Sequence, residues 1–563
     1  MEKSLNDVYK KLEIYFFDHL SSIYYRIKRF SIFKRLFKAI FMQFFSSFKF
    51  KISIALSVFF SIGAHAQILT SKQIDSVVEK TLSTFNVPGI AVSVIKDGKI
   101  IHLKGYGVSS IKTNKKVDEN TLFGVASNTK AFTAAALGML VDEKKITWDT
   151  KVTDIIPEFK MYDAYVTSEF TIRDLLTHRS GLGLGAGDLM IWPDSSTVDK
   201  KQLIHNLRYL KPVSSFRTKY DYDNLMYIVA GEVVARVSGN TYEDFIESRI
   251  IKPLGMTKTA ASWYRLKDKS NVIDGHAPYE GKLLPVGLSF GEIANAAGGI
   301  YSNVTDMSKW VMAMINGGKY GETLDKKLFS PAVARELWTP QTIIAGGNPA
   351  AFSSYGLGWF LSNVNGNFQA THTGGLSGIV TQVTILPELK LGIIVLTNQQ
   401  SGAAFNAITN SIKDGYLGIK GQDRIKTYND NRLRNEKQAD EMVAKVWSDI
   451  AAQQKLSASK PDVKNYYGTF HDAWFGAVSI SDVNGKMHFQ AKNAPKLKGD
   501  MTYYKGNTFI VKWYDRSLDA DAFVNFTLDN NALADGFKIE AISPLTDFSF
   551  DFQDLDFKKT DKK

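Results

Sequence analysis

The chain has 563 residues, of which 44% are hydrophobic and 22% are charged, an ordinary composition for a globular protein. This length exceeds one compact domain and predicts two or three. The formal net charge of +12 is uneven, because residues 1–66 carry 11 Lys and Arg against 4 Asp and Glu. The rest of the chain has only a mild excess, with no basic cluster and no nucleic-acid motif, which excludes nucleic acid as a partner.

An export signal lies inside the chain rather than at its start. An apolar run from Ile52 to Ala64 follows Lys49 and Lys51 and leads into Ala64-His65-Ala66. This order is typical of a secretory signal peptide, with cleavage predicted after Ala66, and the run is too short to span a bilayer comfortably. We expect a soluble mature protein, periplasmic or secreted, with no stable membrane span. The chain has no cysteine, which is compatible with export and excludes disulfides and thiolate catalysis.

The residues before the signal have two interpretations. Translation that starts at Met42 would give a signal of normal length, and residues 1–41 would then not be translated. Alternatively, residues 1–41 are a genuine extension, because Tyr24 to Phe45 mixes aromatic and basic residues as a membrane-surface helix does. We favour the start at Met42.

The first folded segments are a helix and a hairpin. Residues 67–85 predict a helix that begins at Thr70-Ser71. Strands are expected at Ile90–Lys96 and Lys99–Lys104, since Asp97-Gly98 between them is a specific hairpin turn.

A second apolar hairpin lies far along the chain, with strands at Val380–Leu386 and Leu391–Leu396 around Pro387-Glu388. The segments between the two hairpins are mostly helical. Strands at both ends and helices in the middle favour an α+β domain, a helix-covered antiparallel sheet, over alternating parallel units.

The composition changes after about Ser411. Residues 421–441 are charged and polar, and then Val443, Val446, Trp447 and Ile450 fall at helical spacing, which indicates a connecting helix on a neighbour. Beyond Tyr466 the pattern predicts a small all-β barrel. We therefore divide the chain into an extension with signal peptide (1–66), an α+β domain (67–420), a charged helical linker (421–460) and a C-terminal barrel (461–563).

A nucleophile motif stands at the start of one apolar helix. Ser127-Asn-Thr-Lys130 precedes an almost uncharged helical stretch, residues 131–141. Positions three apart share a helix face, so the Lys130 amine can reach the Ser127 hydroxyl and remove its proton. Five other Ser-x-x-Lys matches occur in the chain, so this pattern needs partners elsewhere.

Two further segments offer such partners. Tyr222-Asp-Asn224 stands before an apolar-faced helix, and its phenol can pass a proton if nearby cations depress its pKa; alone, the pair also fits a buried structural tyrosine. We interpret a second pair, Tyr301-Ser-Asn303, as structural. His372-Thr373-Gly374 is the only [His/Lys]-Thr-Gly in the chain, although a lone histidine near glycines also fits a surface turn.

Together and in this order, the three motifs resemble those of the penicillin-recognising serine hydrolases, in the class C β-lactamase-like branch that includes D-aminopeptidases and esterases. Supporting segments are Leu175–Leu182, Ala297–Ser302, Tyr355–Trp359 and Leu396–Asn398. The resemblance covers about residues 70–410 and implies the β-lactamase/transpeptidase fold. The β-rich tail resembles the lipocalin-like domain of some peptidases of this group, on Tyr467-Gly-Thr-Phe470 and its strand pattern.

The resemblance also implies residue roles. Ser127 would be the acylated nucleophile, with Lys130 and Tyr222 sharing general-base and general-acid duty. The backbone N–H groups of Ser127 and Gly375 would form the oxyanion hole. Substrate contacts would come from Asn224, His372, Thr373 and Gly374.

His372 stands where many members of the group carry lysine, so its charge at neutral pH depends on its surroundings. This departure favours a peptidase or esterase acting on small molecules or short peptides, such as D-amino-acid peptides. A class C-like β-lactamase and a penicillin-binding sensor without significant turnover are the alternatives. No metal or organic cofactor is needed. The loop Gly181–Asp194 is expected to line the pocket through Trp192, and the barrel to restrict substrate size, bind a ligand or form a homo-oligomer.

Overall fold

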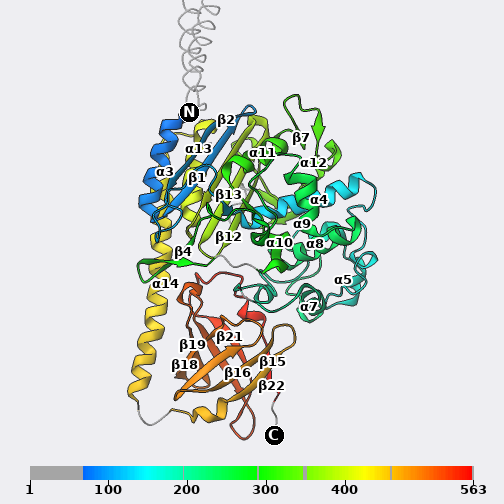
Figure 1. Ribbon diagram of the computed structural model, residues 1–563. Coiled ribbons are helices and arrows are strands. Elements are labelled where there is room, and N and C mark those ends of the chain that lie inside the picture. The colour runs from blue at the N-terminus through cyan, green and yellow to red at the C-terminus, as the bar shows by residue number, and fades with distance from the viewer. Residues whose placement is uncertain (1–67, 195, 288–290, 347–351, 457–459, 561–563) are drawn as a thin grey trace, which may run out of the picture. The chain divides into compact units, whose positions relative to one another are not determined.

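The α+β part of the chain is built on one antiparallel sheet, as the two hairpins predict. The computed structural model describes residues 68–560 except 195, 288–290, 347–351 and 457–459. The sheet has the strand order β2-β1-β14-β13-β12-β11-β10-β9 (Figure 1). Its strands are β1 Gly89–Lys96, β2 Lys99–Gly107, β9 Thr342–Ile344, β10 Ser353–Tyr355, β11 Phe360–Val364, β12 Asn367–Leu376, β13 Ile379–Leu386 and β14 Leu391–Thr397. The predicted signal peptide and extension lie outside the described residues.

Both predicted hairpins are confirmed. Asp97 and Gly98 have φ angles of 51° and 75°, and positive φ at both central residues is what a two-residue hairpin turn of this hand requires. In the second hairpin, a short 3-10 turn at Pro387–Leu389 joins β13 to β14.

Helices cover both faces of the sheet. Alternate residues of β14 point to opposite sides and show which helices pack on each face. Ile393 and Val395 of β14 pack in a cluster with residues of α3 (Ser71–Phe85) and α13 (Gly402–Leu417). On the other face, α11 (Val304–Ile315) packs against β14. A Cβ at Gly392 would lie 2.4 Å from Val311 Cγ1, so this close approach requires glycine.

The predicted helix after Ser127 is confirmed as α4 (Thr129–Asp142), which is buried along nearly its whole length. It packs between α8 (Leu225–Ser238) and α10 (Asn295–Gly298). The remaining helices of this region are α5 Ala164–Glu169, α6 Ile172–Leu175, α7 Lys200–Asn206, α9 Tyr242–Ile246 and α12 Pro331–Leu337; short strand pairs are β3 Phe123–Gly124 with β6 Tyr301–Ser302, β4 Gly275–Tyr279 with β5 Lys282–Val286, and β7 Lys319–Tyr320 with β8 Lys326–Lys327. As predicted, Tyr301-Ser-Asn303 is structural, with Asn303 capping α11.

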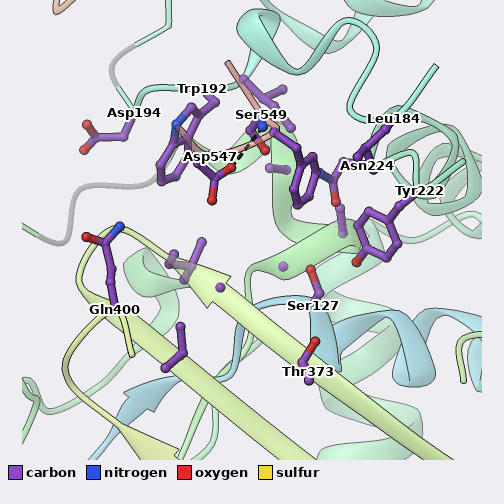
Figure 2. Close-up of a pocket in the computed structure, with 18 of the residues that line it drawn as sticks. Ser127, Leu184, Trp192, Asp194, Tyr222, Asn224, Thr373, Gln400, Asp547 and Ser549 are labelled. Atoms are coloured by element: carbon purple, nitrogen blue, oxygen red, sulfur yellow. Dashed lines mark hydrogen bonds between the residues drawn. The ribbon is translucent and has the colours of Figure 1, made fainter. Parts of the chain in front are cut away.

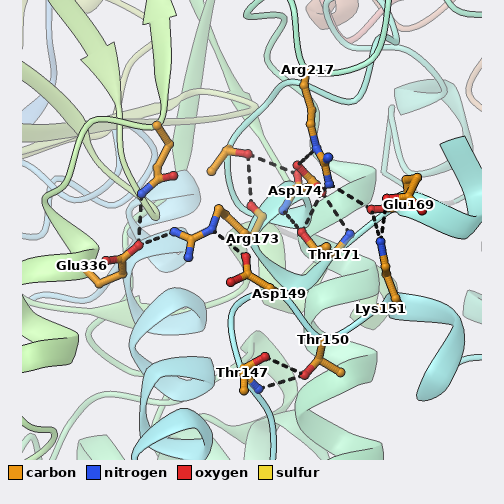
Figure 3. Close-up of polar contacts among 12 residues, drawn as sticks. Thr147, Asp149, Thr150, Lys151, Glu169, Thr171, Arg173, Asp174, Arg217 and Glu336 are labelled. Carbon is orange, nitrogen blue, oxygen red and sulfur yellow. Dashed lines mark hydrogen bonds and ion pairs between the residues drawn. The ribbon is translucent and has the colours of Figure 1, made fainter.

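A polar network holds the start of α6 (Figure 3). The fully buried Asp174 accepts hydrogen bonds from Arg217 Nη2 at 2.6 Å and Arg179 Nε at 3.0 Å. Thr171 caps the same turn and donates its hydroxyl to Asp174 at 2.7 Å. Burial alone would raise the pKa of Asp174, but the Arg217 and Thr171 hydrogen bonds and the arginine charges lower it below its ordinary value. Asp174 is therefore ionised at neutral pH.

A long helix leads to the second region. α14 (Arg424–Lys455) packs on α13 near its start and on β18 near its end. Its predicted apolar positions contact the barrel, because Ile450 clusters with Tyr504, Ile510 and Ile542. Among the described residues, no helix is both long and apolar enough to cross a membrane.

The C-terminal region is a closed antiparallel barrel of eight strands, which confirms the predicted fold (Figure 1). The strands are β15 Gly468–Asp472, β16 Gly476–Val483, β17 Lys486–Ala491, β18 Lys498–Lys505, β19 Thr508–Trp513, β20 Ala522–Leu528, β21 Ala534–Ala541 and β22 Phe557–Lys559. Residues 68 to 563, which include both regions, form one compact unit.

Candidate active site

Ser127 stands in a single 3-10 turn, Ala126–Asn128, directly before α4. The preceding Ala126 has a φ of 52° and is fully buried, a conformation that non-glycine residues rarely adopt and that packing must enforce. Gly374 of β12 presses on this turn, since a Cβ there would lie 2.4 Å from the Val125 carbonyl oxygen. The strand thus fixes the turn that presents Ser127.

The Lys130 amine lies beside the Ser127 hydroxyl, as the three-residue spacing predicts. Lys130 Nζ is 3.1 Å from Ser127 Oγ, 2.7 Å from Asn224 Oδ1 and 3.0 Å from the Ala297 carbonyl oxygen. A neutral amine has two N–H groups and one lone pair. The amide and carbonyl oxygens can only accept, so they take the two N–H groups and the lone pair is left for the Ser127 hydroxyl.

Lys130 is fully buried, and no carboxylate forms an ion pair with it among the described residues. Burial lowers the pKa of Lys130 to about 7, although the charges of Asp188 and Asp223 act in the opposite direction. A substantial fraction of the amine is therefore neutral at neutral pH and able to accept a proton.

The Tyr222 hydroxyl points toward Ser127 (Figure 2), and Lys130 Nζ lies 4.8 Å from the Tyr222 ring centroid. A relay through the phenolate requires that nearby cations depress the pKa of Tyr222, and this condition is not met. Burial raises the pKa of the Tyr222 phenol well above its ordinary value, and a hydrogen bond with Ser127 opposes the shift only in part. The phenol is therefore protonated in the free protein, and it can relay a proton only by giving one and taking another.

Asn224 connects the lysine to a carboxyl group that sequence reasoning missed. Its Oδ1 accepts from Lys130, and its Nδ2 donates to Asp188 Oδ2 at 2.8 Å. The predicted substrate contact by this amide is therefore limited to its remaining N–H. Asp188 lies within the Gly181–Asp194 loop, but one aspartate in a loop carries no pattern that would single it out.

Two other buried groups near Tyr222 were also missed. His178 Nδ1 accepts the backbone N–H of Asp223 at 3.0 Å, and its ring lies 4.2 Å from that of Tyr222. Burial lowers the pKa of His178 well below its ordinary value, and burial raises that of Asp223 to about 6. His178 belongs to the supporting segment 175–182, whose role the sequence left open.

The residues of the third motif lie in two different places in the structure. Thr373 and Gly375 line the pocket with Ser127, and nothing lies within 4 Å of a Cβ built on Gly375. His372 instead lies behind this surface, nearly fully buried, with Nε2 2.9 Å from the Tyr355 hydroxyl and Nδ1 2.6 Å from the Thr373 carbonyl oxygen. Burial and the Lys130 charge lower the pKa of His372 to about 3.

These placements change two of the expected roles. His372 is uncharged at neutral pH and is not among the side chains that line the pocket, so direct binding of substrate by its ring is not supported. Gly374 serves the approach of β12 to the Ser127 turn rather than an open substrate path.

The pocket itself has a volume of about 650 Å³ and extends from Ser127 to the barrel (Figure 2). Trp192 and Leu184 lie in its wall, which confirms that the Gly181–Asp194 loop lines it. The adjoining wall was not expected, since it comes from the barrel and includes Asp547 and Ser549, which lie beside Trp192 (Figure 2). Among the described residues, no group of three or more His, Cys, Asp or Glu could hold a metal ion.

Comparison with models of known protein families shows the family of this chain. The model of the family described as Beta-lactamase matches residues 74–414, which is more than half of the chain. The chain belongs to the beta-lactamase family. A second model, described as a domain of unknown function (DUF3471), matches residues 452–559.

Curated relatives share moderate identity with this family member. An unguisins hydrolase of Aspergillus campestris (strain IBT 28561) is 29% identical over 62% of this chain and 66% of its own length. An unguisins hydrolase of Aspergillus violaceofuscus (strain CBS 115571) is 27% identical over 73% of this chain and 77% of its own length. Protein flp of Staphylococcus aureus (strain NCTC 8325 / PS 47) is 25% identical over 59% and 64%, respectively. The chain thus spans about two thirds to three quarters of these relatives.

Solved structures support the same fold. The octameric penicillin-binding protein homologue from Pyrococcus abyssi aligns with a TM-score of 0.56 and 21% identity, over 87% of this chain and all of that one. A class C beta-lactamase aligns with a TM-score of 0.51 and 21% identity, over 62% of this chain and 96% of that one.

Proposed function

We propose that this beta-lactamase family member is an exported serine hydrolase that cleaves small amides or esters, including D-amino-acid peptides, through an acyl-enzyme on Ser127. The observation that carries the proposal is the Lys130 amine, held 3.1 Å from the Ser127 hydroxyl with two fixed oxygen acceptors on its other side. Membership of the family and the names of the two unguisins hydrolases support a hydrolytic activity.

In the proposed acylation, neutral Lys130 takes the proton of Ser127 Oγ as this oxygen bonds to the substrate carbonyl carbon. The backbone N–H groups of Ser127 and Gly375 stabilise the negative oxygen of the tetrahedral intermediate. The protonated Tyr222 phenol then gives its proton to the leaving nitrogen or oxygen and takes one from Lys130, so that the carbon–heteroatom bond breaks. Water repeats the sequence on the acyl-enzyme and restores Ser127.

The charge of the pocket bears on the substrate. Its lining includes Asp194, Asp519 and Asp547 but no lysine or arginine among the described residues, although Lys496 pairs with Asp194 from outside the lining. The neutral His372 adds no positive charge behind this surface. These features favour substrates with neutral or cationic groups over those that need a fixed positive charge for a carboxylate, and so favour a peptidase or esterase over a β-lactamase.

Export and assembly are part of the same proposal. The signal peptide predicted to end at Ala66 would deliver the protein to the periplasm or the exterior. The octameric state of the Pyrococcus abyssi protein is the reason to keep a homo-oligomer in the proposal, with the barrel as one candidate for the contact.

Labelling with a fluorophosphonate, followed by peptide mass spectrometry, tests the nucleophile. We expect the peptide with Ser127 to gain mass, and Ser127→Ala to lose both the label and the turnover. Ser377→Ala is the matched control, because Ser377 lies in the turn between β12 and β13 and should label normally. A label that persists in Ser127→Ala would refute the proposal.

Substrate assays separate the alternatives that share this chemistry. Faster turnover of D-Ala-p-nitroanilide than of nitrocefin supports the peptidase. The reverse order supports the β-lactamase, and a stoichiometric burst without steady turnover supports the sensor.

A further inference from the structure

One barrel segment, residues 542–556 between β21 and β22, reaches the catalytic region. It lines the pocket through Leu545, Asp547, Phe548 and Ser549. The Phe548 ring lies 5.8 Å from the Tyr222 ring, edge to face. The backbone carbonyl oxygen of Phe548 would lie 2.6 Å from a Cβ at Gly185. The Gly181–Asp194 loop and the barrel segment are therefore in close backbone contact. The barrel thus touches the side chains that surround Ser127.

The same segment holds Asp188 from two directions. Ser549 Oγ donates to Asp188 Oδ2 at 2.8 Å. The Asp551 carboxyl accepts the backbone N–H groups of Gly187 at 2.5 Å and Leu189 at 3.1 Å, which are the residues on either side of Asp188. Both carboxyl groups are fully buried, so neither water nor side-chain motion readily replaces these contacts.

Asp188 in turn determines how the Asn224 amide is oriented. Oδ2 of Asp188 also accepts from Asn224 Nδ2 at 2.8 Å. An amide has one accepting and one donating end, so this bond directs Asn224 Oδ1 toward Lys130, 2.7 Å away. A flipped amide would place its NH₂ group against the lysine amine, and both would then be donors.

The direction of the Lys130 lone pair depends on this amide. With Asn224 Oδ1 and the Ala297 carbonyl oxygen as acceptors, the third direction of Nζ points to Ser127 Oγ. If Asn224 stops accepting, one N–H must find another partner, and the Ser127 oxygen is the acceptor within reach. The amine would then donate to the nucleophile instead of accepting its proton.

We propose that Asp188 is a positioning residue for Lys130, acting through Asn224. In this proposal the C-terminal barrel holds Asp188 in place through Ser549 and Asp551, so the site is incomplete without the barrel. The inference rests on the proposed function, in which Lys130 activates Ser127.

Several ionisable groups lie near Asp188 and Lys130 and affect how the pKa values of these two residues respond to a substitution. Asp223, Asp551, Lys130 and Tyr222 interact electrostatically with Asp188, and His178 and His372 interact with Lys130. Burial raises the pKa of Asp188 to about 8, while the charge of Asp188 raises that of Lys130. Asp188 is therefore largely protonated at neutral and acidic pH, so its replacement by asparagine removes little negative charge near Lys130 in that range.

The test compares Asp188→Leu with Asp188→Asn in the full chain. The readout is the second-order rate of fluorophosphonate labelling at Ser127 from pH 5 to 9. The leucine removes the acceptor for Asn224, and we expect a loss of about 10- to 100-fold, the size expected for a misplaced catalytic group. The asparagine keeps an acceptor for Asn224, so it should recover most of the rate from pH 5 to 9, with an acidic limb close to that of the wild type because Asp188 itself is largely protonated there.

Ser549→Ala tests the barrel contact without emptying a buried site, and Thr546→Ala on the same segment is its matched control. Thr546 does not line the pocket, and its hydroxyl makes only a long 3.4 Å bond to the Asp519 carbonyl oxygen. We expect a loss of about 3- to 5-fold for Ser549→Ala, as for one lost hydrogen bond, and none for Thr546→Ala.

Two results would overturn the inference: equal rates in folded Asp188→Leu and in Asp188→Asn, or equal rates in the Ser549 and Thr546 variants. If Asp188→Leu fails to fold, the other variants still decide. Label that persists in Ser127→Ala refutes the proposed function itself, whereas normal Asp188 variants with an unlabelled Ser127→Ala refute only this inference.

Discussion

Lys130 and Asp174 are both fully buried ionisable side chains of the α+β region, yet their surroundings differ. Asp174 is met by two arginines and a threonine hydroxyl, and its pKa lies below the ordinary value. Lys130 contacts only uncharged oxygens, and burial lowers its pKa to about 7. Burial alone therefore does not decide charge; the partners do.

This difference separates a structural group from a chemical one. Opposite charges around Asp174 offset the cost of burying it, so the cluster keeps its ions and fixes the α6 turn. Lys130 lacks such compensation, and a buried amine with a pKa near the working pH is suited to accept and return a proton. The comparison predicts that altering Lys130 affects rate and altering Asp174 affects stability.

The largest effect is expected for Lys130→Arg. Arginine can still donate to Asn224 and the Ala297 carbonyl, but it remains protonated at any working pH and cannot accept the Ser127 proton. We expect the labelling rate to fall about 10³-fold, within the range for loss of a general base. Thermal melting serves as the control for folding. A folded arginine variant that retains a tenth of the rate would show that the lysine only holds its neighbours.

A smaller effect, on stability rather than rate, is expected for Asp174→Ala. It leaves Arg179 and Arg217 without their buried partner, and we expect a loss of about 3 kcal/mol in the free energy of unfolding, as for a broken buried ion pair. The folded fraction should label Ser127 at the normal rate. Urea unfolding monitored by tryptophan fluorescence measures the change.

The pH dependence of the free energy of unfolding gives a further test of the role of Asp174. Because the pKa of Asp174 is lowered in the folded state, its contribution is present above the ordinary aspartate pKa and is lost as the pH falls through the folded-state value. The wild type should therefore lose more stability between neutral and acidic pH than Asp174→Ala does. Parallel pH curves for the two proteins would contradict the ion-pair explanation.

The features that could be predicted from the sequence are those that depend on short-range patterns of residues. Ser127 and Lys130 are three residues apart on one helix start, and the Asp97-Gly98 turn fixes its own hairpin, so both follow from a short stretch of chain. The antiparallel α+β fold and a small C-terminal β-barrel were likewise expected from strand and helix patterns, whereas the number of barrel strands was not.

The contacts that depend on tertiary packing were not predicted. Ser549 lies 361 positions from Asp188, and nothing in either segment marks the pair before the barrel docks. The raised pKa of Tyr222 also depends on packing, because burial outweighs the effect of its neighbours. His372 is neutral because its strand places the ring behind the pocket, against Tyr355.

Trp192 differs from both Lys130 and Asp174. It lines the pocket but contacts neither the Lys130 amine nor the Asp174 ion-pair cluster. Its ring packs edge to face on Phe550 of the barrel, with centroids 6.3 Å apart. We expect Trp192→Ala to change KM about 3- to 10-fold, and unequally for a bulky and a small substrate, as lost apolar contact does in a binding pocket. The acidic limb of the labelling rate should stay in place, and the unfolding midpoint should move less than in Asp174→Ala. A shifted acidic limb would place Trp192 in the environment of Lys130, and the separation between recognition and proton transfer would fail.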